Sequence, residues 1–170
     1  MKQMFKNLFG KKVKDVDKNL EIKSPMNGSY VPLEDIPDPV FAEKMMGEGF
    51  GVDPSDGEVV APVDGVIMQV FPTNHAVGIK TDNGAEVLIH IGLETVAMEG
   101  RGFEGFVSEG DRVEVGDKLV TFDIDLVKEE ANSTISPVII TNSDELASFD
   151  VQSVSDTVKG ETVVVKAAVK

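Results

Sequence analysis

The feature that most limits the fold of this chain is the β-hairpin signal at Asn83 and Gly84. An Asn-Gly pair tolerates the positive φ angles of a type I′ turn, and residues with high β propensity flank it at 76–81 and 85–91. The pattern therefore predicts two antiparallel strands joined by a tight turn.

This turn would also decide where the two histidines of the 170-residue chain lie. If the loop has two residues, Val77 lies opposite His90 and His75 lies opposite Gly92, so the imidazoles are diagonal neighbours on one face. Any even loop length keeps them on one face. A three-residue loop over 82–84 would shift the register by one residue and send the rings to opposite faces. The strength of the Asn-Gly signal favours the two-residue turn.

The rest of the chain predicts short strands separated by turn residues. Further strands are expected at 20–23, 29–33, 58–61, 65–71, 103–108, 118–123, 137–141 and 162–166. Short helices are expected from a cap at Asp38 to Gly47, from a cap at Asp125 to Asn132, and over 144–149. Regular short strands predict an all-β fold, a compact antiparallel β-sandwich or barrel with a few short helices.

The chain length favours one domain, which we expect to span residues 19–170. Before it, residues 1–18 form a basic amphipathic segment, in which five lysines precede the first acidic residue at Asp15. Such a segment is compatible with weak contact with an anionic membrane surface. It is equally compatible with a flexible, solubilising tail.

Composition excludes several classes of function. The chain has no cysteine, which rules out disulfides, thiolate nucleophiles and cysteine metal sites. A net charge of -14 argues against nucleic-acid binding and favours basic partner proteins. No apolar run approaches the ~18 residues of a membrane span, and no secretory signal follows the basic start. Gly-Lys-Ser/Thr phosphate loops, GxSxG and HExxH motifs are also missing.

Chemistry therefore depends on His75 and His90, because imidazole can act as a base, a metal ligand or a phosphoryl-accepting nucleophile. Apolar neighbours of His90 would lower its pKa and keep the ring neutral and nucleophilic. Thr73 lies two residues before His75, and its hydroxyl could fix one tautomer of that ring. One ring would then accept a phosphoryl group while the other steadies it.

Other interpretations of the pair stay open at this point. Both histidines could be structural, or they could bind zinc with a carboxylate added. A zinc hydrolase of related β architecture needs a His-x-His pair, but Leu88 stands two residues before His90. A biotinyl or lipoyl carrier needs a hairpin lysine beside small or Met residues, a context that neither Lys80 nor Lys118 has.

The motif LIHIGLETV at 88–96, with His90 within L-I-H-x-G-[LI]-[DE]-T-V, resembles the glucose-specific IIA components of the bacterial sugar phosphotransferase system. The resemblance extends in order over about residues 20–166. It is also carried by DIPDPVFAEKMMGEGFGVDP at 35–54, APVDGVI at 61–67, TNHA at 73–76, GDRVEVGDKLVTFD at 110–123 and SPV at 136–138.

The resemblance implies a β-sandwich with a shallow depression that holds both histidines. His90 would be phosphorylated by the histidine-containing phosphocarrier protein, His75 would support it, and a cysteine of the IIB domain of a glucose-type sugar transporter would receive the phosphoryl group. No cofactor is required for transfer, although relatives can hold zinc between the two histidines at partner interfaces. Relatives also regulate other proteins when unphosphorylated, and the resemblance implies a cytoplasmic protein, with peripheral membrane contact through residues 1–18.

An apolar rim that excludes water from the phosphohistidine is implied as well. The expected rim residues are Val40, Phe41, Met45, Met46, Phe71, Leu88 and Ile91, with Asp38 and Glu94 as acidic contacts to a basic partner. Ordinary core packing is the alternative, and it is favoured more for Leu88 than for Phe41, which we expect on a short helix. Asp38 could serve only as a helix cap. Ile91 and the region near Gly78 lack the aromatic side chains common in the family.

Overall fold

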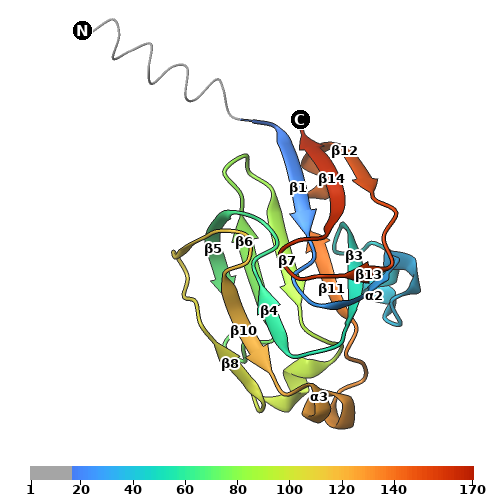
Figure 1. The fold of residues 1–170 in the computed structure, drawn as a ribbon, viewed down its shortest axis with the longest axis vertical. Coiled ribbons are helices and arrows are strands. Elements are labelled where there is room, and N and C mark those ends of the chain that lie inside the picture. Colours follow the sequence, from blue (N-terminus) through green and yellow to red (C-terminus); the bar gives the residue numbers. More distant parts are fainter. Residues whose placement is uncertain (1–16) are drawn as a thin grey trace, which may run out of the picture.

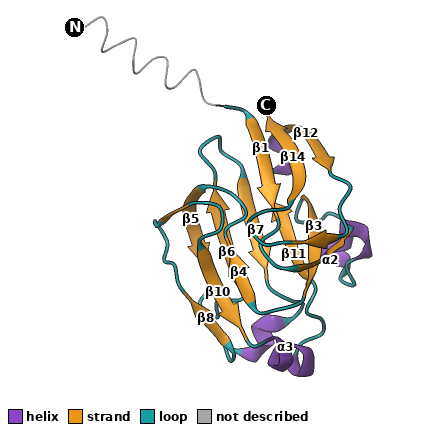
Figure 2. Cartoon of the chain, in the orientation of Figure 1, coloured by secondary structure: helices purple, strands orange, loops and turns teal. Residues whose placement is uncertain are grey.

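A computed structural model describes residues 17–170, and this part of the chain is mainly β-structure (Figures 1 and 2). The antiparallel all-β fold predicted from the sequence is confirmed. The basic amphipathic segment predicted at the start of the chain lies outside the described residues, apart from Asp17 and Lys18.

The largest sheet has eight strands in the order β13-β2-β3-β11-β7-β6-β5-β9. Their bounds are Gly28–Val31 (β2), Glu48–Pro54 (β3), Gly65–Val70 (β5), Ala76–Lys80 (β6), Glu86–His90 (β7), Arg112–Val113 (β9), Ser136–Ile140 (β11) and Asp156–Thr157 (β13). All seven pairings between neighbouring strands of this sheet are antiparallel.

Two three-stranded sheets pack with the large one, with the orders β1-β14-β12 and β4-β10-β8. Their bounds are Asn19–Lys23 (β1), Glu58–Val60 (β4), Phe103–Gly105 (β8), Lys118–Phe122 (β10), Leu146–Val151 (β12) and Val163–Val169 (β14). The helical segments are short: Leu33–Asp35 (η1), Pro39–Ala42 (α2), Thr95–Met98 (η2), Ile124–Glu130 (α3) and Ser143–Glu145 (η3). Figure 1 places α2 at one side of the β-structure and α3 at its lower end.

The main core covers one face of the large sheet. Phe50, Val138, Ile89 and Val77 are successive partners across β3, β11, β7 and β6, and each is at most 1% exposed. The opposite face carries a smaller apolar cluster made of Leu33, Ile36, Phe41, Leu93 and Ile139. Because side chains alternate along a strand, the residue after Ile89 points to this second face.

The predicted hairpin exists as β6 and β7, but the predicted register is wrong by one residue. Lys80 pairs with Glu86, and Thr81 N–H donates to the Ala85 carbonyl at 2.9 Å, so the loop has three residues. Within it only Gly84 adopts a positive φ, of 95°. The Thr81 hydroxyl oxygen accepts the Ala85 N–H at 3.0 Å, and the Asn83 amide bonds to main-chain carbonyls near β1. These side-chain bonds stabilise the longer loop.

Two further elements differ from the sequence-based expectation. Residues 144–149, expected to be helical, form part of η3 and then strand β12, because pairing with β14 overrides their weak helical preference. The helix expected from a cap at Asp125 is α3, and its cap is Asp123, whose side chain accepts the Leu126 N–H at 3.1 Å. The Asp38 cap of α2 is confirmed by its bond from the Val40 N–H at 2.9 Å.

Strand β3 was not expected from the sequence, because its glycines weaken the strand signal. A Cβ at Gly49 would lie 2.0 Å from the Val138 carbonyl oxygen, so glycine is required for the close approach of β3 to β11. The glycine that obscures the strand in the sequence is therefore a condition for its pairing.

Candidate functional site

The two histidines lie side by side, as the sequence predicted, although the register on which that prediction rested is wrong. Their ring centroids are 5.2 Å apart and their planes meet at 77°. His90 ends β7 opposite Ala76, whereas His75 is the last residue of the loop between β5 and β6. Asn74 has a left-handed φ of 58°, so the alternation of the strand does not extend back to His75. The loop, rather than the pleat, turns its ring toward His90.

The tautomer of His90 follows from its hydrogen bond. Nδ1 lies 2.8 Å from the carbonyl oxygen of Gly92. A carbonyl can only accept, so Nδ1 carries the proton, and in the neutral ring Nε2 keeps a free lone pair. Burial lowers the pKa of His90, while the Gly92 carbonyl and the Asp38 carboxylate act in the opposite direction. The predicted lowering of the pKa is confirmed, and Nε2 is the ring nitrogen with the free lone pair.

His75 is a buried residue, with 4% of its surface exposed, whereas His90 is half-buried. Burial, and secondly the neighbouring His90, lower its pKa from 6.5 to about 4. The Thr73 hydroxyl is hydrogen-bonded to Nδ1 of His75, as predicted, although it reaches the ring across a turn rather than along an extended strand. The Thr73 bond therefore leaves Nε2 of His75 as the ring nitrogen available to another group.

An aromatic side chain packs against each imidazole. Phe41 lies 5.4 Å from the ring of His90, and Phe71 lies 5.3 Å from that of His75, edge-on at 70°. Phe41 is only 5% exposed and joins α2 to the small apolar cluster, whereas Leu88 is only partly buried on the outer face. The expectation that Leu88 is the more core-like of the two is therefore wrong. Strand β7 points Leu88 outward together with His90.

The expected rim divides into exposed and buried residues. Val40 and Met45 are 41% and 71% exposed, and Met46 and Phe71 are partly exposed. Ile91 is 1% exposed and belongs to the main core, so its predicted place on the rim is wrong. It follows His90 in the chain and points to the opposite face.

An apolar hollow of about 210 Å³ lies beside the histidines and includes three of the rim residues, Met46, Phe71 and Leu88. Its lining residues are Met46, Met68, Gln69, Phe71, Gly78, Glu86, Val87, Leu88 and Thr141. Gly78 lies opposite Leu88 on β6, so the absence of a side chain there helps to keep the hollow open.

The site has few acidic side chains, and the described residues offer few metal ligands. Asp38 caps α2 and partly offsets the lowering of the His90 pKa by burial, while Glu94 adopts a left-handed φ of 61° at the start of η2. Among residues 17–170, no group of three or more His, Cys, Asp or Glu side chains is arranged to hold a metal ion. His75 and His90 can therefore offer a zinc ion two ligands from the described part of the chain.

Two residues that order this site were missed by sequence reasoning. The Gly92 carbonyl holds Nδ1 of His90, and Ser136 holds the Gly92 N–H at 3.0 Å. A glycine two residues after a histidine in a strand is a weak sign of such a turn. No local pattern could reveal Ser136, because 44 residues separate it from Gly92.

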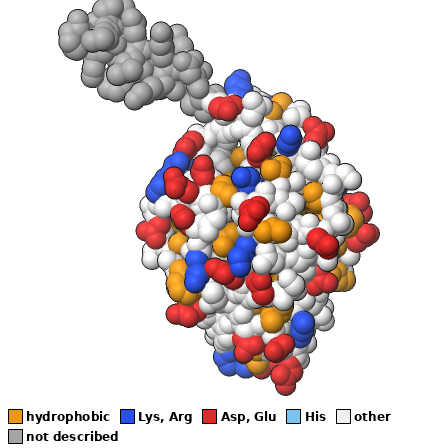
Figure 3. Space-filling model, viewed as in Figure 1, with side chains coloured by type: hydrophobic (Ala, Val, Ile, Leu, Met, Phe, Trp, Pro, Cys, Tyr) orange, Lys and Arg blue, Asp and Glu red, His pale blue; other side chains and the backbone are white. Residues whose placement is uncertain are grey.

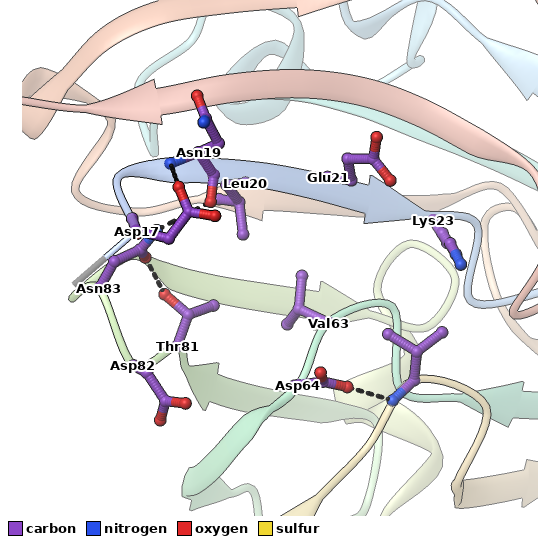
Figure 4. Close-up of a pocket in the computed structure, with 11 residues that line it drawn as sticks. Asp17, Asn19, Leu20, Glu21, Lys23, Val63, Asp64, Thr81, Asp82 and Asn83 are labelled. Atoms are coloured by element: carbon purple, nitrogen blue, oxygen red, sulfur yellow. Dashed lines mark hydrogen bonds between the residues drawn. The ribbon is translucent and has the colours of Figure 1, made fainter. Parts of the chain in front are cut away.

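A larger hollow of about 570 Å³ lies away from the histidines, between β1 and the loop after β6 (Figure 4). Carboxylates of Asp17, Glu21, Asp64 and Asp82 line it, together with Lys23. Part of this polarity is structural, because Asp64 accepts the Val115 N–H at 2.8 Å. Acidic side chains are also spread over the face seen in Figure 3, as the net charge of -14 requires.

Three comparisons with known proteins agree with this geometry. Residues 20–146 match the family model described as the phosphoenolpyruvate-dependent sugar phosphotransferase system, EIIA 1. Relatives named PTS system glucose-specific EIIA component include one from Staphylococcus epidermidis, 55% identical over 98% of this chain and 99% of that protein. Another, from Halalkalibacterium halodurans, is 59% identical over 95% of this chain and 96% of that protein. The solved structure of glucose permease IIA from Mycoplasma capricolum is 41% identical, covers 88% of this chain and 96% of its own, and superposes with a TM-score of 0.81.

Proposed function

The chain belongs to the EIIA 1 family of the phosphoenolpyruvate-dependent sugar phosphotransferase system, and on this premise we propose that it carries its phosphoryl group on Nε2 of His90. Its function is that of a phosphocarrier in sugar transport, and this transfer requires no cofactor. The observation that carries the assignment to His90 is the bond from Nδ1 to the Gly92 carbonyl, because it leaves Nε2 unprotonated.

In the proposed transfer, the Nε2 lone pair attacks the phosphorus of a phosphohistidine on the histidine-containing phosphocarrier protein. The new N–P bond forms as the donor's N–P bond breaks, and the electron pair of that bond returns to the donor's ring. The Nδ1 proton of His90 stays in place. The positive charge that develops on the ring faces the Gly92 carbonyl and the Asp38 carboxylate. In the second step, a IIB thiolate attacks the same phosphorus and displaces His90.

His75 is proposed to stabilise the transferred group rather than to accept it. If the Thr73 hydroxyl donates to Nδ1 of His75, the neutral ring carries its proton on Nε2. That N–H can donate to a phosphoryl oxygen, where charge accumulates during transfer. The pKa of about 4 keeps His75 neutral at pH 7, so it contributes a hydrogen bond instead of a full positive charge.

The proposed partners are the histidine-containing phosphocarrier protein and the IIB domain of a glucose-type transporter. The apolar hollow beside the histidines would receive an apolar side chain of a partner, and Val40 and Met45 would extend this contact. Asp38 and Glu94 would attract a basic partner surface. Regulation of other proteins by the unphosphorylated form would use the same face.

Zinc binding and membrane contact are proposed only as secondary properties. Because His75 and His90 supply two ligands, a carboxylate of a partner would have to complete a zinc site. Among residues 17–170, no helix is long and apolar enough to cross a bilayer. A cytoplasmic protein with weak peripheral contact through the lysine-rich segment at 1–18 is the arrangement we propose. The zinc-hydrolase alternative receives no support from the comparisons.

The test uses the full chain, the phosphocarrier protein and a radiolabelled phosphoryl donor. We expect His90→Gln to abolish labelling, because Gln has no nucleophilic ring nitrogen. His75→Gln should still be labelled at His90, but should pass the group to a IIB domain more slowly. Labelling that persists in His90→Gln would exclude His90, and normal onward transfer by His75→Gln would exclude the supporting role of His75.

A further inference from the structure

We infer that Ser136 is a positioning residue that selects the reactive tautomer of His90 by holding the backbone of Gly92. The functional importance of this role rests on the proposed phosphorylation of His90. Its structural part, the choice of tautomer, can be measured without any phosphoryl transfer.

The hydrogen bonds form a chain with one possible direction. Ser136 is fully buried at 0% exposure, and its hydroxyl donates to the Thr134 carbonyl at 2.9 Å. Its only proton is therefore used, and its oxygen accepts the Gly92 N–H at 3.0 Å. The carbonyl of the same Gly92 accepts the Nδ1 proton of His90 at 2.8 Å. Ser136 and His90 thus hold the two polar groups of one glycine.

Gly92 needs this support because it lies where the sheet ends. The ladder between β7 and β11 stops at the pair Ile89 and Val138, and Gly92 turns away with a φ of 68°. Its N–H consequently lacks a strand partner, and the Ser136 hydroxyl takes the place of a main-chain carbonyl. A Cβ at Gly92 would lie 2.7 Å from Cγ2 of Thr95, so the turn is confined as well as bonded.

The two peptide groups that meet at the Gly92 Cα each carry a further hydrogen bond, so three bonds hold this turn and Ser136 supplies one of them. The Thr95 hydroxyl donates to the Ile91 carbonyl at 2.6 Å, and the Leu93 N–H donates to the Ser133 carbonyl at 2.9 Å. Without the Ser136 oxygen, the buried Gly92 N–H would have no acceptor, and an unpaired buried N–H is costly. A shift of the Gly92 main chain toward another acceptor would relieve that cost and lengthen the hydrogen bond between its carbonyl and Nδ1 of His90.

Loss of the Gly92 carbonyl would release the tautomer of His90. The ring could then carry its proton on Nε2, and this form has no lone pair on the nitrogen that faces the partner in the proposed transfer. Weakening the bond by about 0.7–1.4 kcal/mol would shift the ratio of the two tautomers about three- to tenfold toward the unreactive form, and phosphoryl acceptance would slow as the reactive fraction falls.

The experiment compares Ser136→Ala with Ser24→Ala as a matched control. Ser24 is also 0% exposed, its hydroxyl donates to the Met26 carbonyl at 2.7 Å, and its oxygen accepts the Met26 N–H at 3.4 Å. Both variants should lower stability. Long-range ¹H–¹⁵N spectra of the ring nitrogens should place the proton on Nδ1 of His90 in the wild type and in Ser24→Ala. They should show a mixture of tautomers in Ser136→Ala, and Ser136→Thr should restore the wild-type pattern.

A wild-type tautomer in folded Ser136→Ala, or an equal change in Ser24→Ala, would overturn the inference. If Ser136→Ala does not fold, Ser136→Cys serves instead, because it keeps the shape of the side chain and weakens the acceptor. Its spectrum should show a partial shift of the His90 tautomer, and an unchanged spectrum would again overturn the inference. Failure of the proposed function is distinguishable, because it would appear as persistent labelling of His90→Gln, whatever the tautomer spectra show.

Discussion

Protonation of His75 should destabilise the fold by an amount that the structure allows to be calculated. Burial and the neighbouring His90 lower the pKa of His75 from 6.5 to about 4. The folded protein therefore binds this proton less tightly than the unfolded chain does. The stabilisation is fully present above pH 6.5 and is lost as the pH falls toward 4. The difference in pKa corresponds to about 3 kcal/mol of unfolding free energy, of which about 2 kcal/mol is lost by pH 5.

Urea unfolding of the wild type and of His75→Gln between pH 7.5 and 4 would measure this term. Carboxylates titrate in both proteins, so the difference between their unfolding free energies isolates His75. We expect the wild type to lose about 2 kcal/mol relative to the variant between pH 7 and 5. NMR titration of the His75 ring provides the control. A difference that does not depend on pH, or a ring that titrates near 6.5, would refute the argument that burial keeps His75 neutral.

Three further predictions follow from the site. Gly92→Ala should lower the unfolding free energy by about 2–4 kcal/mol in urea unfolding, because of its φ of 68° and the contact with Thr95. The control Gly110→Ala, at a φ of 93° with open space around it, should lower it by less. Equal losses in the two variants would show that the contact with Thr95 does not matter. Gly78→Met should fill the apolar hollow and slow phosphoryl transfer with a partner about tenfold. It should cost little stability, because the tight contact of the added Cβ is with the flexible side chain of Met68, at 3.2 Å. An unchanged transfer rate would show that the hollow is not part of the interface. Calorimetry should detect tight zinc binding only when a partner carboxylate is present, and high affinity of the isolated chain would contradict the two-ligand argument.

Prediction from sequence succeeded where local patterns decide the outcome. Asn83 and Gly84 marked the hairpin, and the apolar neighbours of His90 indicated the lowered pKa of its ring. The register could not be predicted in the same way. It depends on the Asn83 amide, which bonds to the carbonyls of Asp17 and Asn19, more than 60 residues away in the chain.

The errors at other positions have a related cause. Residues 146–149 form part of β12 because they pair with β14. The sequence around them does not show this partner, because β14 begins more than ten residues later. Gly49 looks like an interruption until the carbonyl of Val138 is placed against it. Phe41 is buried because α2 packs it against Leu93 and Ile139, and the sequence does not show this contact between distant segments.

The two imidazole rings are held by different kinds of backbone, and this difference determines which ring can move. His90 is held by paired neighbours in the middle of the large sheet, whereas His75 ends a five-residue connection with one left-handed residue. The ring centroids are 5.2 Å apart, so a phosphoryl group between the imidazoles needs more space. The loop that carries His75 can provide this space more easily than the paired strands around His90. When the phosphoryl group is transferred to His90, we therefore expect the loop that carries His75 to move outward, while the strands around His90 keep their positions.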